Sequence, residues 1–263
     1  MHILALMLAV SGAFHFGETK FQPADAIAWQ VDGKDGKPLT LVAFADFKID
    51  RQEVMEAIDP VAAFITQMNT NQKGNFVIVR LTSPDHCGLA GFVGNGAKQI
   101  DVGDSFTSKA SVGIERVAGR CSTSKPGKMF DDAYDFDLTY DLPLTAIPKP
   151  SKLPAGGGEP GAAYAALVKA IQAADWNAAH LHLRKDEVPA TKPKASAMKE
   201  YFHDIGLNYP KTVTVTGGLI KGDRANLDIR GTNYEDKKIH GVVVIRKFDG
   251  NWRVLENEFY FEQ

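Results

Sequence analysis

The stretch from residue 211 to residue 261 alternates between apolar and polar side chains with a period of two. Four runs carry this alternation or are rich in β-branched residues, and they are 212–216, 225–230, 242–245 and 252–255. Short turn sequences containing Gly, Asn and Asp separate the runs. Because successive side chains of a strand point to opposite faces, this pattern predicts a meander of four antiparallel strands with one apolar face.

Three helices are expected before these strands, because the preceding segment carries apolar residues at helical spacing. In residues 161–174 the apolar stripe consists of side chains three or four positions apart, namely Tyr164, Leu167, Val168 and Ile171. Asp175 is expected to cap a second, shorter helix, and residues 195–205 form the third. This order predicts an α+β domain in which three helices cover one face of a four-stranded antiparallel sheet.

The first half of the chain predicts a β-rich, sandwich-like domain over residues 24–142. Its short strand-like runs are cut by Gly, Pro, Asn and Ser, which is typical of compact β domains. One helix is expected at about residues 60–69, with Asp59 as its cap. Residues 143–160 hold five prolines and a Gly-Gly-Gly run, so we interpret them as a linker to a second domain, 161–263.

Residues 1–13 are predicted to be a secretory signal peptide, because residues 3–10 are all apolar and Ser-Gly-Ala follows them. The alternative is a buried first strand, since His2 is the only basic residue before the apolar run. That run is too short to cross a bilayer, which takes about 20 residues. If the protein is periplasmic or secreted, Cys87 and Cys121 are expected to form a disulfide, and if it is cytosolic they are buried thiols.

Charge and composition argue against several classes of partner. The formal net charge is −2, with 30 Lys and Arg against 32 Asp and Glu, and no run of five like charges occurs. Nucleic-acid binding is therefore not expected, and no transmembrane segment or cofactor is predicted. The Gly-rich run at residues 91–96 precedes a strand-like segment rather than a helix, so we interpret it as a hairpin turn rather than a phosphate-binding loop.

Two short motifs lie in the second half of the chain. Residues 174–179 read Ala-Asp-Trp-Asn-Ala-Ala, and residues 248–254 read Phe-Asp-Gly-Asn-Trp-Arg-Val. With the opening helix, they resemble the nuclear transport factor 2-like superfamily, which includes the ketosteroid isomerase and SnoaL groups. The resemblance covers residues 161–263 and implies a curved sheet wrapped around helices. The N-terminal half resembles no family.

The same resemblance implies a pocket with an Asp or His general base in some members, and binding or assembly without catalysis in others. No position of this chain matches a catalytic motif of the superfamily. The extra strand that usually falls between the second and third helices is also missing, and the charged, proline-containing residues 183–194 take its place. This shortened edge weakens the expectation of a deep pocket.

Ionisable side chains on the predicted strands are the candidate catalytic residues, namely Glu256, Glu258, His240 and Asp228. If Trp252 and Val254 face the helices, strict alternation directs Glu256 and Glu258 the same way. Burial would raise the pKa of such a carboxyl and allow it to act as a general acid, with His240 or Asp228 as the base. The alternative is that the last strand twists away and leaves both glutamates in water. The candidate ligand-binding residues are Tyr164, Trp176, Tyr201 and Trp252.

No metal site is predicted. His180 and His182 are two positions apart on an expected helix, where side chains at that spacing point about 200° apart and cannot share an ion.

The sequence therefore favours an exported protein that binds a small ligand or an envelope protein partner without catalysis. One alternative is an isomerase or dehydratase that uses a pocket carboxylate. A second is a structural module that forms a homodimer through the C-terminal sheet. An enzyme needs an enclosed cavity with a buried ionisable group, a binding module needs a cavity or an exposed patch, and a dimer module needs an apolar outer sheet face.

Overall fold

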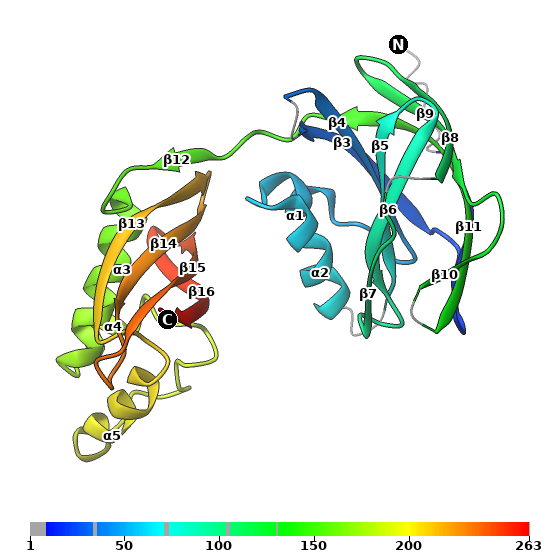
Figure 1. Ribbon diagram of the computed structural model, residues 1–263. Helices are drawn as coiled ribbons and strands as arrows, with labels where there is room; N and C mark the ends of the chain where they lie inside the picture. Colours follow the sequence, from blue (N-terminus) through cyan, green and yellow to red (C-terminus); the bar gives the residue numbers. More distant parts are fainter. Residues whose placement is uncertain (1–8, 34–35, 71–73, 104–105, 130, 263) are drawn as a thin grey trace, which may run out of the picture. The chain divides into compact units, whose positions relative to one another are not determined.

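The computed structural model describes residues 9–33, 36–70, 74–103, 106–129 and 131–262. The chain divides into two compact units, Met1–Ile147 and Pro148–Gln263, which are described separately below (Figure 1). No helix in the described ranges is both long enough and apolar enough to cross a bilayer.

The described part of the first unit consists mainly of strands. They are β1 (Ala9–Phe16), β2 (Thr19–Phe21), β3 (Asp25–Asp32), β4 (Pro38–Ala45), β5 (Phe76–Ser83), β6 (His86–Val93), β7 (Lys98–Asp101), β8 (Phe106–Val112), β9 (Arg116–Ser122), β10 (Gly127–Met129) and β11 (Asp132–Thr145). Two helices, α1 (Arg51–Glu56) and α2 (Pro60–Thr70), lie between β4 and β5.

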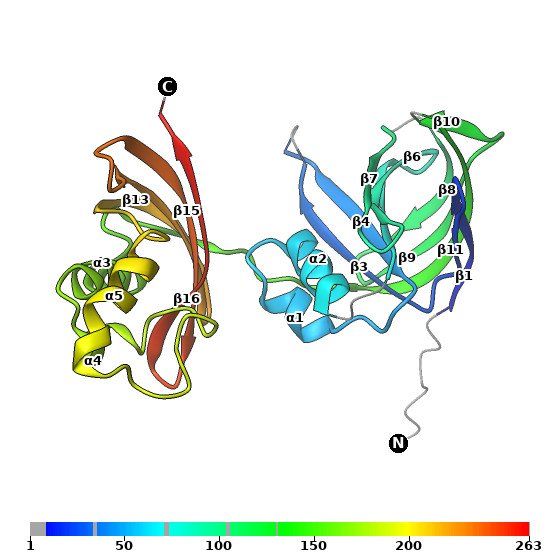
Figure 2. The same ribbon diagram turned by 90° about the horizontal axis from the view of Figure 1, so that it is seen from below.

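These strands form one sheet that closes on itself. The hydrogen-bonded order is β2-β1-β11-β3-β4-β5-β6-β8-β9, and β9 pairs with β11 again (Figure 2). The strands from β11 to β9 therefore form a barrel, in which every pairing is antiparallel except that of β11 with β3. The sequence predicted a sandwich-like domain of packed sheets, and this is corrected. The long strand β11 reaches β1, β3 and β9, and so joins what would otherwise be two separate edges.

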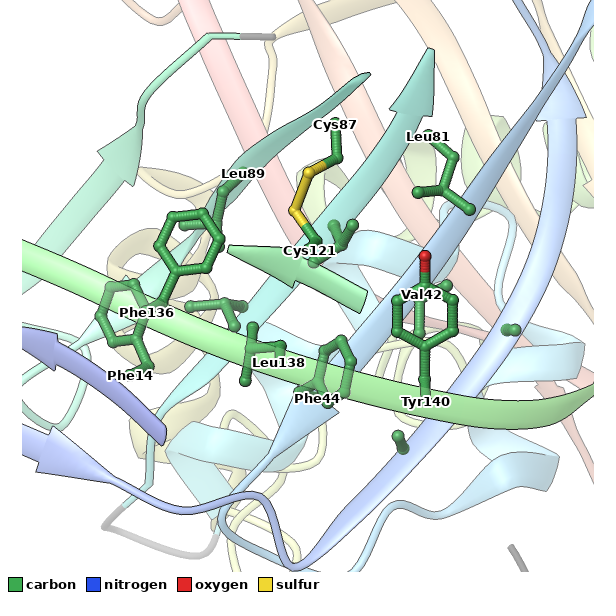
Figure 3. Packing of buried hydrophobic residues seen from close by; sticks show 14 of the residues in the cluster. Phe14, Val42, Phe44, Leu81, Cys87, Leu89, Cys121, Phe136, Leu138 and Tyr140 are labelled. Carbon is green, nitrogen blue, oxygen red and sulfur yellow. A yellow bond between two sulfur atoms is a disulfide. The ribbon is translucent and has the colours of Figure 1, made fainter. Parts of the chain in front are cut away.

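The barrel interior is filled with aromatic and aliphatic side chains (Figure 3). Phe14 stacks on Phe136 with ring centroids 6.2 Å apart, and Phe44 meets Tyr140 edge to face at 6.0 Å. Because burial of each aromatic ring removes a large apolar area from water, this layer stabilises the unit.

A second apolar layer lies on the outer face of β3, β4 and β5, where α1 and α2 cover the sheet. Trp29 of β3 stacks on Phe64 of α2 with centroids 6.0 Å apart. These central strands are buried on both faces, which explains why residues 41–45 of β4 are all apolar. Helix α1, which Asp50 caps through the Glu53 N–H, is an addition to the single helix that the sequence predicted.

The predicted disulfide is confirmed. Cys87 of β6 and Cys121 of β9 are joined, with an S–S distance of 1.95 Å and Cα atoms 6.3 Å apart. Both side chains are fully buried in the barrel (Figure 3). The bond spans β8, whose residues Phe106 and Ser108 are the register partners of the two cysteines.

The division between the two units, after Ile147, lies inside the predicted linker, but parts of that stretch belong to the two sheets. The expected linker begins at Pro143, but β11 continues to Thr145, because Leu144 and Thr145 pair with β3. Within the same stretch, β12 (Ser151–Leu153) pairs with the sheet of the second unit. Residues 1–8 of the predicted signal peptide lie outside the described residues, and residues 9–13 belong to β1, which pairs with β11.

The second unit has the predicted α+β order. Helices α3 (Gly158–Gln172), α4 (Trp176–Ala179) and α5 (Ala195–Gly206) precede strands β13 (Thr212–Lys221), β14 (Arg224–Thr232), β15 (Lys238–Phe248) and β16 (Asn251–Phe261). The four predicted strands form an antiparallel meander, and β12 adds a fifth strand at one edge. The three helices lie against one face of this second sheet (Figure 2).

The core between helices and sheet forms where the sequence predicts it. All four side chains of the α3 stripe are buried, as are the inward positions of the central strands. Ala225, Leu227 and Ile229 of β14 face the helices, and Val243 and Ile245 continue the same layer on β15. The opposite face of this sheet carries the polar side chains of the alternating pattern.

Candidate functional site

A β-bulge at Leu255 decides which way the end of β16 faces. Ile245 pairs with Val254 and Val244 pairs with Glu256, so Leu255 has no partner and the alternation shifts by one position. Trp252 and Val254 point to the helices as expected, but Glu256 and Glu258 are exposed. Strict alternation would have taken both side chains into the core with Trp252, and this does not occur. The alternative that leaves them in water is confirmed, through a bulge rather than a twist.

The other two candidate catalytic residues lie on the same outer face, and both are exposed. Asp228 of β14 and Glu258 of β16 flank Val242 of β15 in one cross-strand row. His240 occupies the next row, between Arg230 and Tyr260. The structure therefore brings the four candidates onto one face, but it places that face in solvent rather than over a cavity.

At the end of this face lies a groove of about 660 Å³, lined by Arg230, His240, Phe261 and Glu262. Tyr260 borders it, with its ring centroid 5.8 Å from that of His240. We call these five side chains the distal groove. Phe261 is 62% exposed and Tyr260 54% exposed, which is unusual for large aromatic side chains.

The polar groups of the distal groove are only partly engaged. The Tyr260 hydroxyl donates a hydrogen bond of 3.1 Å to Glu258, and this bond to a carboxylate raises the pKa of Tyr260. The Lys237 ammonium lies 5.8 Å from the centroid of the Phe261 ring. Within the described ranges, the Arg230 side chain has no hydrogen-bond or ion-pair partner. A guanidinium beside exposed aromatic rings is well suited to contact a partner's carboxylate or carbonyl groups.

The four candidate ligand-binding aromatics do not converge on one space. Tyr164 and Trp252 are core side chains, whereas Trp176 and Tyr201 are half-buried. Trp176 stacks on His180 with centroids 5.2 Å apart and lies 5.8 Å from Tyr201.

Both His180 and His182, which the sequence analysis set aside as a metal pair, have a backbone carbonyl group next to a ring nitrogen. The Nδ1 atom of His180 lies 2.8 Å from the Trp176 carbonyl oxygen, and that of His182 lies 2.6 Å from the Trp252 carbonyl oxygen. In the parts of the chain that the structure describes, no three His, Cys, Asp or Glu side chains converge to hold a metal ion.

The sequence analysis missed a buried carboxylate at Glu187, whose side chain is only 6% exposed. The Tyr209 hydroxyl donates a hydrogen bond of 2.6 Å to one of its oxygens, and Asn208 donates one of 3.3 Å to the other. The Arg184 backbone N–H donates a further hydrogen bond of 3.3 Å to the Glu187 carboxylate. The Arg184 Nε atom lies 3.6 Å from the same carboxylate and forms an ion pair with it. Tyr201 donates to the Glu187 backbone carbonyl oxygen at 2.8 Å.

This carboxylate changes the chemistry of the neighbouring phenols. Burial raises the pKa of Tyr209, and the charge and hydrogen bond of Glu187 raise it further. Burial and the same charge raise the pKa of Tyr164, whose hydroxyl has no hydrogen-bond partner among the described residues. The sequence did contain a signal for this network, namely Tyr164 on α3, Tyr201 on α5 and Tyr209 just beyond α5. Buried phenols need hydrogen-bond acceptors, so these three tyrosines indicated that an acceptor lies near them.

The Glu187 network lies next to a second groove of about 490 Å³, lined by Arg184, Lys185, Asp186, Val254 and Leu255. Glu187 is not part of that lining. Because its oxygens already accept three hydrogen bonds, it fixes the loop between α4 and α5 and has little capacity left to bind a substrate.

Comparison with known proteins adds no assignment to these features. No known protein family, curated protein or solved structure matches this chain.

Proposed function

We propose that this chain is a non-catalytic binding protein, and that the second unit contacts a protein partner through the distal groove. The proposal rests on the pair of exposed aromatic rings, Tyr260 and Phe261, beside Arg230, which has no side-chain partner among the described residues. Tyr, Trp, Phe and Arg are the side chains that dominate the binding energy of protein interfaces. Exposed apolar side chains gathered at one place are likewise typical of interaction sites.

A protein segment fits this groove better than a small molecule does. Small-molecule sites usually enclose most of the ligand surface. The distal groove instead lies open at the end of the sheet, with Tyr260 on the outer face and Phe261 on the inner face, and both rings remain largely in solvent. An extended or loop segment of a partner can cover such rings and also place a carboxylate against Arg230.

Catalysis has less support. The isomerase or dehydratase alternative needs a buried and accessible carboxyl group, and Glu256 and Glu258 are both exposed. Glu187 is buried, but its oxygens already accept hydrogen bonds from Tyr209, Asn208 and the Arg184 N–H. The homodimer alternative needs an apolar outer sheet face, whereas this face carries charged residues in most of its rows.

The proposed setting is the periplasm or the extracellular space, supported by the Cys87–Cys121 disulfide, since such bonds persist in oxidising compartments. A relationship of the second unit to nuclear transport factor 2-like domains is also proposed. It is supported by the order of three helices followed by an antiparallel meander, with the helices on one sheet face.

Selection of peptides from a random display library tests the binding proposal on the full chain. We expect enriched peptides to lose about tenfold or more in affinity when Tyr260→Ser and Phe261→Ser are combined, because both rings are interface anchors. Both side chains are exposed, so the double variant is expected to fold. The matched control is Ile114→Ser, which removes another exposed apolar side chain, 97% exposed, from the first unit. Enriched peptides that bind the double variant as tightly as the wild type would contradict the proposal.

A further inference from the structure

The C-terminal half of β16 has one edge that no other strand of the described chain pairs with. The second sheet has the order β12-β13-β14-β15-β16, so β16 pairs with β15 on one side only. Near its start His182 engages the free edge twice. The Val254 N–H donates to the His182 carbonyl oxygen at 2.9 Å, and the His182 Nδ1 atom lies 2.6 Å from the Trp252 carbonyl oxygen. Beyond the bulge, no backbone group of residues 257–261 has a hydrogen-bond partner on that edge within the described chain.

The direction of each amide follows from the ladder. The Glu262 N–H donates to the Lys238 carbonyl oxygen at 3.1 Å, so it points toward β15. Because N–H directions alternate along a strand, the N–H groups of Asn257, Phe259 and Phe261 point away from β15, to the free edge. Unpaired backbone groups in this arrangement are a template for another strand.

The side chains beside this edge differ between the two faces. On the outer face, Glu256, Glu258 and Glu262 are exposed, and none has an ion-pair partner among the described residues. On the inner face, Phe261 is exposed, and so is Leu207 at the end of α5, at 64%. Leu207 is next to Asn208, whose carbonyl oxygen lies 3.5 Å from the Asn257 side-chain nitrogen. The edge is therefore acidic on one face and apolar on the other.

Pairing with β16 of a second copy is disfavoured by these charges. Two copies related by a two-fold axis would pair their β16 strands antiparallel. If the axis passes through any of residues 257–260, glutamates of the two copies lie directly opposite each other, for example Glu256 against Glu258 or Glu262. Like charges in direct cross-strand positions are destabilising. The complementary occupant is a strand that carries cations on the outer face and apolar side chains on the inner face.

We propose, on the basis of the binding function above, that the partner segment adds to β16 as a further strand. Its residues alternate between Lys or Arg, which face Glu256 and Glu258, and apolar side chains, which face Leu207 and Phe261. The backbone hydrogen bonds supply affinity, and the alternate side chains supply specificity, as in other cases of strand addition. The free edge from Glu256 to Phe261 accommodates about 20 Å of extended chain.

A synthetic peptide of about seven residues with alternating Lys and Val, blocked at both ends, tests this with the full chain. We expect measurable binding by calorimetry, and at least about tenfold weaker binding of a peptide with the same composition in blocks, because only alternation separates charge from apolar surface. The double variant Glu256→Gln with Glu258→Gln is expected to lose about tenfold in affinity. The matched control is Asp228→Asn, which removes an exposed carboxylate two strands away on the same face.

N-methylation of the peptide provides the decisive readout. A bound strand turns only every second N–H toward β16, so methylation of one alternate set is expected to abolish binding and methylation of the other set to leave it unchanged. Equal effects of both sets would overturn strand addition. Asn257→Pro removes a backbone donor at the free edge without breaking the pairing with β15. If the free chain sediments as a dimer and this variant sediments as a monomer, the occupant of the edge is a second copy, and the proposed partner segment is wrong.

These outcomes separate the two proposals. If library peptides bind through Tyr260 and Phe261 but tolerate methylation at every position, strand addition is wrong and the binding function stands. If no library peptide and no alternating peptide binds, both proposals are wrong.

Discussion

Replacing Cys87 and Cys121 together by alanine is expected to lower the free energy of unfolding of the first unit by about 4 kcal/mol. The disulfide closes a loop with a sequence separation of 34, and a crosslink of that length removes about this much conformational entropy from the unfolded chain, expressed as free energy. The loss is a large fraction of the 5–15 kcal/mol by which folded domains are typically stable.

Urea denaturation of the full chain measures this effect, because Trp29 reports on the first unit, whereas Trp176 and Trp252 belong to the second. The transition of the second unit is the internal control, since that unit contains no cysteine, and its midpoint should not move. Dithiothreitol should shift the first transition of the wild type to that of the double variant. An unchanged first transition under reducing conditions would show that the disulfide does not stabilise the barrel.

The second unit is expected to lose about 2.7 kcal/mol of stability per pH unit above about pH 10. The pKa values of Tyr209 and Tyr164 are raised in the folded state, because both phenols are buried and face Glu187. In the unfolded chain, both return to the ordinary tyrosine pKa of about 10. The stability due to the raised pKa values is therefore fully present below pH 10. It is lost as the pH rises, because the unfolded chain releases protons that the folded unit retains.

Denaturation curves between about pH 9 and about pH 12 give this slope directly. Tyr209→Phe should reduce it to about 1.4 kcal/mol per pH unit, because one of the two phenols is removed. The exposed Tyr234→Phe is the control and should leave the slope unchanged. A slope near zero for the wild type above pH 10 would contradict the burial of these two phenols beside Glu187.

Local sequence patterns predicted much of the fold of the second unit. Period-two alternation located β13 to β16, and the spacing of Tyr164, Leu167, Val168 and Ile171 located the buried face of α3. Both patterns report on a single element against one apolar layer, so they can be read without knowledge of distant contacts. The disulfide was predictable for a similar reason, because only one pairing of two cysteines exists.

Features that depend on distant contacts were not predictable in the same way. Closure of the barrel requires β11 to meet both β3 and β9, which no local pattern encodes. The bulge at Leu255 inserts one residue opposite β15, and a strictly alternating pattern cannot show where the extra residue lies. That single residue directs Glu256 and Glu258 to the outer face, whereas strict alternation would direct them toward the helices.

The Glu187 network illustrates the same limit at the level of side chains. Its flanking sequence, with Arg184, Lys185 and Asp186, resembles an exposed loop. The carboxylate is buried because Tyr209 and Asn208, beyond α5 in the sequence, fold back to donate hydrogen bonds to it. A buried charge with such partners depends on tertiary contacts that the loop sequence alone does not contain.

Hydrogen exchange at three backbone amides tests the central proposal most directly. In the free full-length protein, the amides of Asn257, Phe259 and Phe261 should exchange rapidly, because they point to an open edge, whereas those of Glu258 and Tyr260 should be protected by pairing with β15. Addition of the alternating Lys–Val peptide should protect the three open amides and leave the other two unchanged. If the three amides exchange equally fast with and without bound peptide, the edge of β16 is not the binding site.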